Sequence, residues 1–151
     1  PWGWIGNRTT LWEQVEKSIE TTMRGKKPEA PVVEALVAYL ELFDTAPPGS
    51  VEQNRASVKR GSGVFERLKC GKCHRPPAYT TAGSYDVGLA DETGQDSYNP
   101  PSLRGLPHRG RFLHDNRTRS LSRALELHRP AAMKDLPDTA RSDLLSFLLS
   151  L

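Results

Sequence analysis

The sequence predicts a mostly α-helical protein with one long irregular segment. Five segments carry apolar residues at helical spacing. Between residues 75 and 110 no such period is sustained, and this part of the chain is rich in Gly and Pro. A compact helical bundle does not need so long a connection. We therefore expect the segment over residues 76–107 to wrap around something held by the helices.

The composition is that of a globular protein of one domain. The 151 residues are 36% hydrophobic and 26% charged, and no run of 18 apolar residues is present, so we expect no membrane span. The formal net charge is +3, with Lys and Arg interspersed among Asp and Glu, which disfavours nucleic-acid binding. The opening Pro1 suggests a processed protein or an excised fragment.

Two helices are expected near the N-terminus. Apolar residues recur every four positions over residues 11–23 and predict a helix for which Thr9 or Thr10 is the N-cap. A broad apolar stripe over residues 32–43 predicts the second helix, which ends before Pro47. The members of this stripe are Val32, Val33, Leu36, Tyr39, Leu40 and Phe43.

A third helix is expected from Val51 or Arg55 to Lys69, with Gly61 and Gly63 in its interior. Each interior glycine destabilises a helix by roughly 1 kcal/mol relative to alanine. The pair therefore predicts close approach of another helix or of a ligand.

Helical spacing returns over residues 120–128 and 138–151, where Asp138 is a plausible N-cap. The last helix is apolar at nearly every position after residue 143, as expected of a helix buried against others. Residues 6–11 and 115–121 are weakly similar to each other, and each stretch opens an amphipathic helix. This similarity suggests a duplicated ancestral unit.

The two cysteines lie within the motif Cys70-Gly71-Lys72-Cys73-His74. Cys-x-x-Cys-His is the spacing of c-type haem attachment, in which two thiols bind the haem covalently and the adjacent imidazole binds its iron. A redox-active dithiol normally starts a helix that follows a strand, whereas here a helix precedes the cysteines. A zinc site would need two further ligands at finger-like spacing. The motif therefore predicts one haem c per chain, with His74 as an axial ligand.

The second axial ligand is less clearly marked. The candidates after the motif are His108, His114, His128 and Met133. We favour His128, with Met133 as the alternative, although a histidine at a helix C-terminus can be purely structural and a lone methionine more often fills a core. Two imidazoles give a lower reduction potential than the pair of histidine and methionine.

The sequence resembles the C-terminal haem domain of the bacterial dihaem cytochrome c peroxidase and MauG family. The similar stretches occur in the family's order and cover nearly everything after Gly61. They are Gly61-x-x-x-Phe65, the Cys70–His74 motif, Pro76-Pro77-x-Tyr79-Thr80, Tyr85-Asp86-Val87-Gly88, Pro101–Leu106, Leu113-His114-Asp115, Ser120–His128 and Leu144–Leu151.

The resemblance implies a cytochrome c-like domain over residues 51–151. Residues 1–50 would form an N-terminal helical extension, similar to the end of the family's first haem domain but without its haem-binding motif. His128 stands where the family places its distal ligand, commonly methionine or tyrosine. Asn116 replaces a frequent glycine at a position that asparagine tolerates in the left-handed conformation.

The resemblance also implies further residues around the haem. Arg104 matches an arginine near a haem propionate, where a guanidinium pairs well with a carboxylate. Tyr79, Leu103 and Leu106 are expected in the wall that excludes water from the haem. Tyr79 could equally be ordinary core.

We expect a one-electron carrier domain within a larger redox protein, which exchanges electrons with a partner protein or with a neighbouring haem domain. The alternative is a domain that feeds electrons to the catalytic haem of a peroxidase-like or MauG-like oxidoreductase, in which case enzymatic activity requires a longer parent. Haem is normally attached covalently outside the cytoplasm, so a periplasmic or otherwise exported bacterial protein is expected. The sequence contains no signal for an oligomeric state.

Overall fold

The computed structural model describes residues 2–43, 47–48 and 55–151, apart from the side chain of Pro130. The elements are α1 (Leu11–Lys17), the π-helical turn η1 (Ser18–Thr22), α2 (Ala30–Glu41), α3 (Arg55–Arg67), the 3₁₀ turn η2 (Cys70–Lys72), β1 (Tyr85–Asp86), β2 (Ser97–Tyr98), the 3₁₀ turn η3 (Leu106–His108), α4 (Leu121–His128), α5 (Pro130–Lys134) and α6 (Asp138–Leu148). The predicted fold class is confirmed. The boundary expected between residues 50 and 51 and a helix start at Val51 lie outside the described residues.

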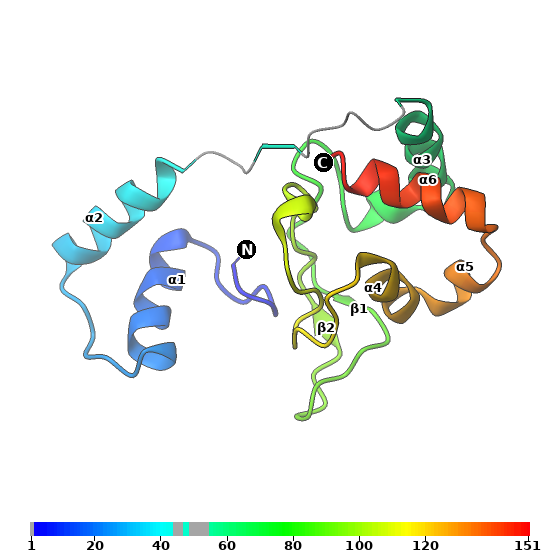
Figure 1. Ribbon diagram of the computed structural model, residues 1–151. Helices are drawn as coiled ribbons and strands as arrows, with labels where there is room; N and C mark the ends of the chain where they lie inside the picture. Colours follow the sequence, from blue (N-terminus) through cyan, green and yellow to red (C-terminus); the bar gives the residue numbers. More distant parts are fainter. Residues whose placement is uncertain (1, 44–46, 49–54) are drawn as a thin grey trace.

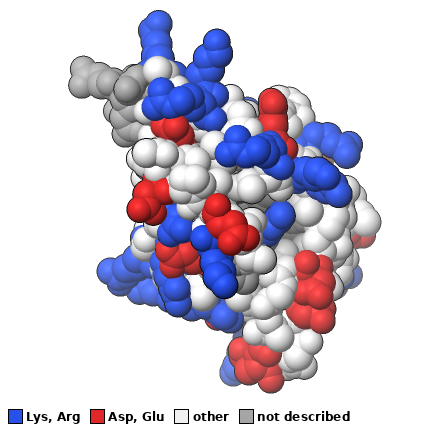
Figure 2. Space-filling view, turned by 90° about the vertical axis from the view of Figure 1, so that its right-hand side faces the viewer, with Lys and Arg blue, Asp and Glu red and all other residues white. Residues whose placement is uncertain are grey.

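The irregular segment runs along one side of the helices α3 to α6 (Figure 1). It contains the short antiparallel pair of β1 and β2, in which Tyr85 pairs with Tyr98, and it ends in the turn η3. No helix in the described part of the chain is long and apolar enough to cross a membrane. Figure 2 shows Lys and Arg interspersed with Asp and Glu on one face of the molecule.

The helix expected over residues 11–23 is formed by α1 and the turn η1. Thr10 is its N-cap and forms a capping box: the Glu13 amide donates to the Thr10 hydroxyl at 3.1 Å, and the Thr10 amide donates to the Glu13 carboxylate at 3.3 Å. The Thr9 amide and hydroxyl also donate to the Glu13 carboxylate, at 2.8 and 3.0 Å, and these bonds, with that from the Thr10 amide, lower the pKa of Glu13. Met23 follows the helix and is exposed, so it does not belong to the buried face.

The apolar stripe of α2 is mostly exposed. Val33 is fully buried where α2 packs against α1. The other large side chains of the stripe are open to solvent, with exposed fractions of 50% for Val32, 38% for Leu36, 58% for Tyr39, 41% for Leu40 and 62% for Phe43. Figure 1 shows the α1–α2 pair standing apart from the remaining helices.

The main core is formed where α3 packs against α6. Val64 and Phe65 of α3 are buried together with Leu144, Phe147 and Leu148 of α6. A bidentate ion pair joins α3 and α6. The Arg60 guanidinium donates to both oxygens of the Asp143 carboxylate, at 2.7 and 2.8 Å. This pairing lowers the pKa of Asp143 and fixes the register of the two helices.

The two glycines of α3 differ in their surroundings. A Cβ atom at Gly61 would lie 2.0 Å from the carbonyl oxygen of Asp143 and 2.7 Å from the Cβ of Phe147. Close helix packing therefore explains Gly61, as the sequence suggested. At Gly63 a Cβ atom would meet nothing within 4 Å, so the same expectation is wrong for Gly63.

This contrast gives a matched pair of stability predictions. Gly61→Ala forces α6 away from α3 and is expected to lower the free energy of unfolding by about 3 kcal/mol. Gly63→Ala adds no clash and removes the helix penalty of glycine, so it is expected to raise stability by roughly 1 kcal/mol. Urea unfolding followed by circular dichroism measures both; equal effects of the two substitutions would contradict the packing described here.

The last two predicted helices, α4 and α6, begin close to their expected positions. Ser120 is the N-cap of α4, and its hydroxyl accepts a hydrogen bond from the Arg123 amide at 3.2 Å. The expected N-cap of α6 is wrong by one residue: Pro137 occupies the cap position, and Asp138 is the first helical residue. Its carboxylate still favours the positive end of the helix dipole.

Candidate haem site

A large cavity of about 570 Å³ lies between the irregular segment and helices α3, α4, α5 and α6. Its walls are mainly apolar and include Leu89, Leu103, Leu106, Leu125 and Met133. Cys70, Cys73, His74 and His128 all line it. An apolar cavity with a few polar groups is typical of a site for a cofactor or another small molecule.

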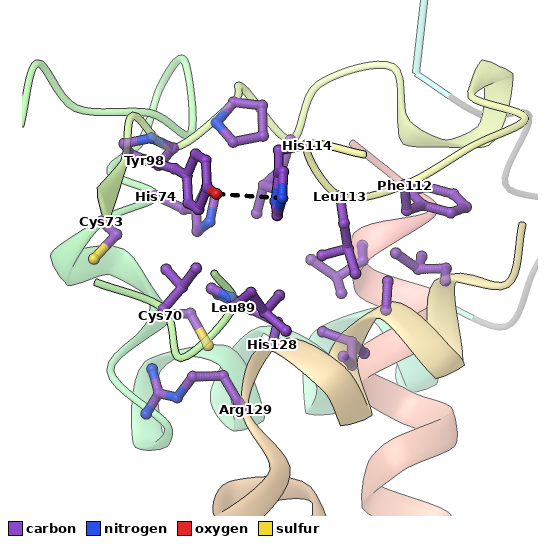
Figure 3. A pocket seen from close by; sticks show the side chains of 18 of the residues that line it. Cys70, Cys73, His74, Leu89, Tyr98, Phe112, Leu113, His114, His128 and Arg129 are labelled. Carbon is purple, nitrogen blue, oxygen red and sulfur yellow. Dashed lines mark hydrogen bonds between the residues drawn. The ribbon is translucent and has the colours of Figure 1, made fainter. Parts of the chain in front are cut away.

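The cysteine motif forms a tight turn at the end of α3. The helix stops at Arg67, Lys69 has left-handed backbone with φ of 57°, and the turn η2 follows. The amides of Cys73 and His74 both donate to the Cys70 carbonyl, at 3.2 and 2.9 Å. This turn brings both thiols and the His74 imidazole to the same cavity, as Figure 3 shows.

The environment of the thiols does not suit a redox-active dithiol. Both cysteines are free, and burial raises the pKa of each. Reactive dithiols need at least one thiol with a lowered pKa. The described residues contain no cluster of three His, Cys, Asp or Glu side chains that could hold a metal ion without a further group.

His74 is held in one orientation by a backbone carbonyl. Its Nδ1–H donates to the carbonyl of Tyr79 at 3.1 Å, which leaves Nε2 as the free lone pair of the ring. Tyr79 has a φ of 52°, in the left-handed region. The unusual backbone at Tyr79 thus accompanies the contact that fixes the tautomer of His74.

His128, at the C-terminal end of α4, faces His74 across the cavity (Figure 3). The two ring centres are 6.4 Å apart, and the ring planes are inclined by 76°. Imidazole nitrogens bind metals at about 2 Å, so two rings that share one metal ion have their centres about 6 Å apart. Burial and the nearby His74 lower the pKa of His128 to about 4, so His128 is neutral at pH 7, as a metal ligand must be. The donor set and its spacing fit an iron with two axial histidines.

The other candidate ligands are engaged elsewhere or lie in the core. His114 stacks on Tyr98, with ring centres 4.2 Å apart, and its Nε2 lies 3.2 Å from the Tyr98 hydroxyl. His108 is exposed and donates from Nε2 to the Pro47 carbonyl. Met133 is 3% exposed and borders the cavity from within the hydrophobic core.

The structure brings some of the other expected residues to the cavity and not others. Leu103 and Leu106 line it. The ring of Tyr79 packs in the core against Phe65 and Phe147, and Tyr79 does not border the cavity. Arg104 does not border it either, among the residues that the structure describes.

Arg109 is one of several cavity residues that the sequence did not single out. Its guanidinium donates to the Ser102 carbonyl at 2.7 Å, and burial lowers its pKa. Arg109, Arg111 and Arg129 all border the cavity. Arg129 lies beside the cysteines, where its charge partly offsets the rise in their pKa values that burial causes. Three arginines between residues 104 and 111 look alike in sequence, so only the path of the loop decides which of them reaches the cavity.

Known proteins resemble this chain in sequence and in fold. No protein-family model matches the sequence. The chain is 27% identical to the methylamine utilization protein MauG of Methylophilus methylotrophus over an alignment 143 positions long, gaps included, which covers 77% of this chain and 43% of that protein. The chain thus spans less than half of the length of this curated relative.

Two solved structures share the fold. Hydrazine synthase of Kuenenia stuttgartiensis superimposes with a TM-score of 0.73 at 18% identity, over 91% of this chain and 60% of that chain. A MauG-like protein associated with microbial copper homeostasis gives a TM-score of 0.73 at 16% identity, over 99% of this chain and 68% of that chain.

Proposed function

We propose that this chain, which is similar in sequence to MauG and in fold to a MauG-like protein, is a c-type cytochrome domain that transfers single electrons through one covalently bound haem. Cys70 and Cys73 would hold the haem through thioether bonds, and His74 and His128 would bind its iron. The observation that carries the proposal is the 6.4 Å separation of the two imidazole rings in an apolar cavity that also contains both thiols.

Each residue has a distinct task in this function. The thiols anchor the cofactor, and the Tyr79 carbonyl keeps the lone pair of His74 Nε2 available. His128 would be the second protein ligand of the iron, and an iron held by both imidazoles would have no open position for peroxide. The apolar wall of the cavity would exclude water from the haem. It would thereby limit the rearrangement of solvent when the charge of the haem changes on oxidation or reduction. The haem itself supplies the one-electron exchange between ferric and ferrous iron.

The location and partners follow from the same chemistry. Covalent attachment of haem is normally carried out on exported, unfolded chains, so we infer a periplasmic or otherwise exported protein. The electron partner would be a soluble redox protein or a neighbouring haem domain of the same parent.

Expression together with a c-type haem maturation system tests the proposal. The purified chain is expected to gain the mass of one haem, to retain the haem after acidified-acetone extraction, and to give low-spin paramagnetic resonance spectra. A chain without covalent haem would refute the proposal, and a high-spin spectrum of the wild-type chain would instead favour an enzymatic haem.

Arg109→Gln is expected to make the midpoint potential of the haem more negative by on the order of 50 mV. The half-buried guanidinium stabilises an added electron on the haem, and its removal withdraws this stabilisation. Arg104→Gln is the matched control and should change the potential much less, because Arg104 does not border the cavity. Spectroelectrochemical titration measures both; a larger shift for Arg104→Gln would show that Arg104 is the important charge.

A further inference from the structure

The excess positive charge of the chain lies at the cysteine motif. The 151 residues carry a formal net charge of +3, with histidine counted as neutral. Residues 66–75 contain four cationic side chains and one anionic side chain, so this stretch alone accounts for the +3, and the rest of the chain is formally neutral. The four cations are Arg67, Lys69, Lys72 and Arg75. The net charge of the molecule is therefore concentrated on the turn that carries both thiols.

All four cationic side chains are exposed, whereas the cysteines beside them border the cavity. Helix α3 ends at Arg67, and the left-handed backbone of Lys69 leads the chain into η2, which ends at Lys72. None of the four cations takes part in an ion pair among the residues that the structure describes. Unpaired charges on an exposed turn attract an oppositely charged molecule over about the Debye length, roughly 10 Å at 0.1 M salt.

Arg129 adds a fifth positive charge from a distant part of the chain. It lies between α4 and α5 and is exposed, and its guanidinium donates to the Leu68 carbonyl at 3.4 Å. Figure 3 shows the side chain of Arg129 beside Cys70. The charge of Arg129 acts on both thiols and that of Lys72 acts on Cys73, where each partly offsets the rise in thiol pKa that burial causes. Cations from two parts of the chain thus lie next to the cysteine turn.

A small apolar surface adjoins these charges. Residues 76–78, Pro-Pro-Ala, follow the motif directly and are all exposed. Two hydrogen bonds hold this stretch in place: the Ser102 hydroxyl donates to the Ala78 carbonyl at 2.6 Å, and the Thr81 hydroxyl donates to the Cys73 carbonyl at 3.0 Å. Protein interfaces combine an apolar centre with a polar rim, and proline and alanine lose no side-chain entropy when they are covered. The stretch is therefore a preformed contact surface.

We propose that residues 67–78 together with Arg129, the cationic turn, are the docking surface for a separate redox protein with an acidic surface. This docking surface depends on the proposed function, in which Cys70 and Cys73 hold the haem, because the thioether bonds would then join the cofactor to this turn. One electron would pass between the partner's cofactor and the haem iron. One centre is oxidised as the other is reduced, and no bond is formed or broken.

The charges favour a mobile protein partner over other polyanions. A partner in electron transfer has to associate quickly and leave again, and exposed opposite charges speed association more than they strengthen the complex. A permanent contact with another domain buries a larger and more apolar surface. Nucleic acids and lipids carry negative charge but no redox centre, so contact beside the haem-binding cysteines would serve neither. An acidic redox protein therefore fits both the charge of the surface and its position.

Oxidation of the ferrous, haem-loaded chain by two small complexes of opposite charge tests the electrostatics of the cationic turn. In Lys69→Glu with Arg75→Glu, oxidation by hexacyanoferrate(III) is expected to be about tenfold slower than in the wild-type chain, and oxidation by hexaammineruthenium(III) to be faster. Lys17→Glu with Lys26→Glu is the matched control, because it changes the net charge equally but away from the motif. Stopped-flow absorbance at low salt measures the rates. Damage to the fold would move both rates of the turn variant in the same direction.

A short fluorescein-labelled oligoglutamate shows whether an acidic polypeptide binds the same surface. Fluorescence anisotropy is expected to show salt-sensitive binding to the wild-type chain, which Lys69→Glu with Arg75→Glu weakens about tenfold or more. The control variant should bind with nearly the wild-type affinity. Tighter binding to phosphatidylglycerol vesicles than to oligoglutamate, at equal concentrations of negative charge, would overturn the proposal in favour of a membrane surface.

The haem content of the purified chain separates a failure of the docking surface from a failure of the proposed function. A chain without covalent haem refutes the proposed function and the docking surface with it, and its mass reveals this before any rate is measured. In a haem-loaded chain, wild-type rates with both complexes in the turn variant would overturn the docking surface alone. Oligoglutamate binding that is absent, or indifferent to the two substitutions, would do the same.

Discussion

Replacing His128 by alanine is expected to convert a six-coordinate, low-spin haem into a five-coordinate, high-spin haem. His74 remains bound, since the Tyr79 carbonyl still orients its ring. The lost imidazole leaves the second axial position open within the apolar cavity. Carbon monoxide should then bind the reduced protein rapidly, whereas in the wild-type chain it must first displace His128.

Paramagnetic resonance of the ferric protein and stopped-flow carbon monoxide binding measure this change. His114→Ala is the matched control, because His114 lines the same cavity but is bonded to Tyr98. Met133→Ala should destabilise the fold by about 3 kcal/mol through the cavity that it leaves, without a change of spin state. Loss of the low-spin spectrum in Met133→Ala, with none in His128→Ala, would make methionine the ligand.

The double substitution Cys70→Ala with Cys73→Ala is expected to abolish covalent haem attachment. The thiols are the only cysteines of the chain, so no other residue can form a thioether. Any haem retained through the two imidazoles should be lost on extraction with acidified acetone. Intact-mass spectrometry of the purified chain, with and without extraction, measures the result.

Lys72→Ala is the control for this experiment, because it changes the motif without removing a thiol. It should keep the full haem content. The double variant should also be less stable than the wild-type chain, since a cofactor bound to the folded state adds to its free energy of unfolding. Extraction-resistant haem in the double variant would refute thioether attachment through these cysteines.

The sequence was informative wherever a feature depends on local spacing. Helical periodicity located α1, α3, α4 and α6, and Gly61 indicated the close contact with α6. The motif from Cys70 to His74 needs only five consecutive residues, so its turn was predictable. Asn116 is left-handed, as the resemblance implied.

Features that depend on the path of the irregular segment were not predictable. Arg109 rather than Arg104 borders the cavity, and Tyr79 acts through its carbonyl rather than through its ring. Both are set by contacts between residues that are far apart in sequence. The apolar stripe of α2 shows a related limit, because a helical pattern reveals an apolar face but not what covers it.

The positions of His108 and His114 bear on how a haem-loaded chain acquires its final ligands. In the unfolded chain the iron stays tethered beside His74, and each later histidine must close a loop to reach it. Closing the loop to His128 costs about 0.3 kcal/mol more than closing the loop to His114, and about 0.4 kcal/mol more than to His108. Chain entropy therefore favours the wrong histidines. The folded protein reverses this order, because it holds His114 against Tyr98 and His108 against Pro47 and leaves only His128 facing His74.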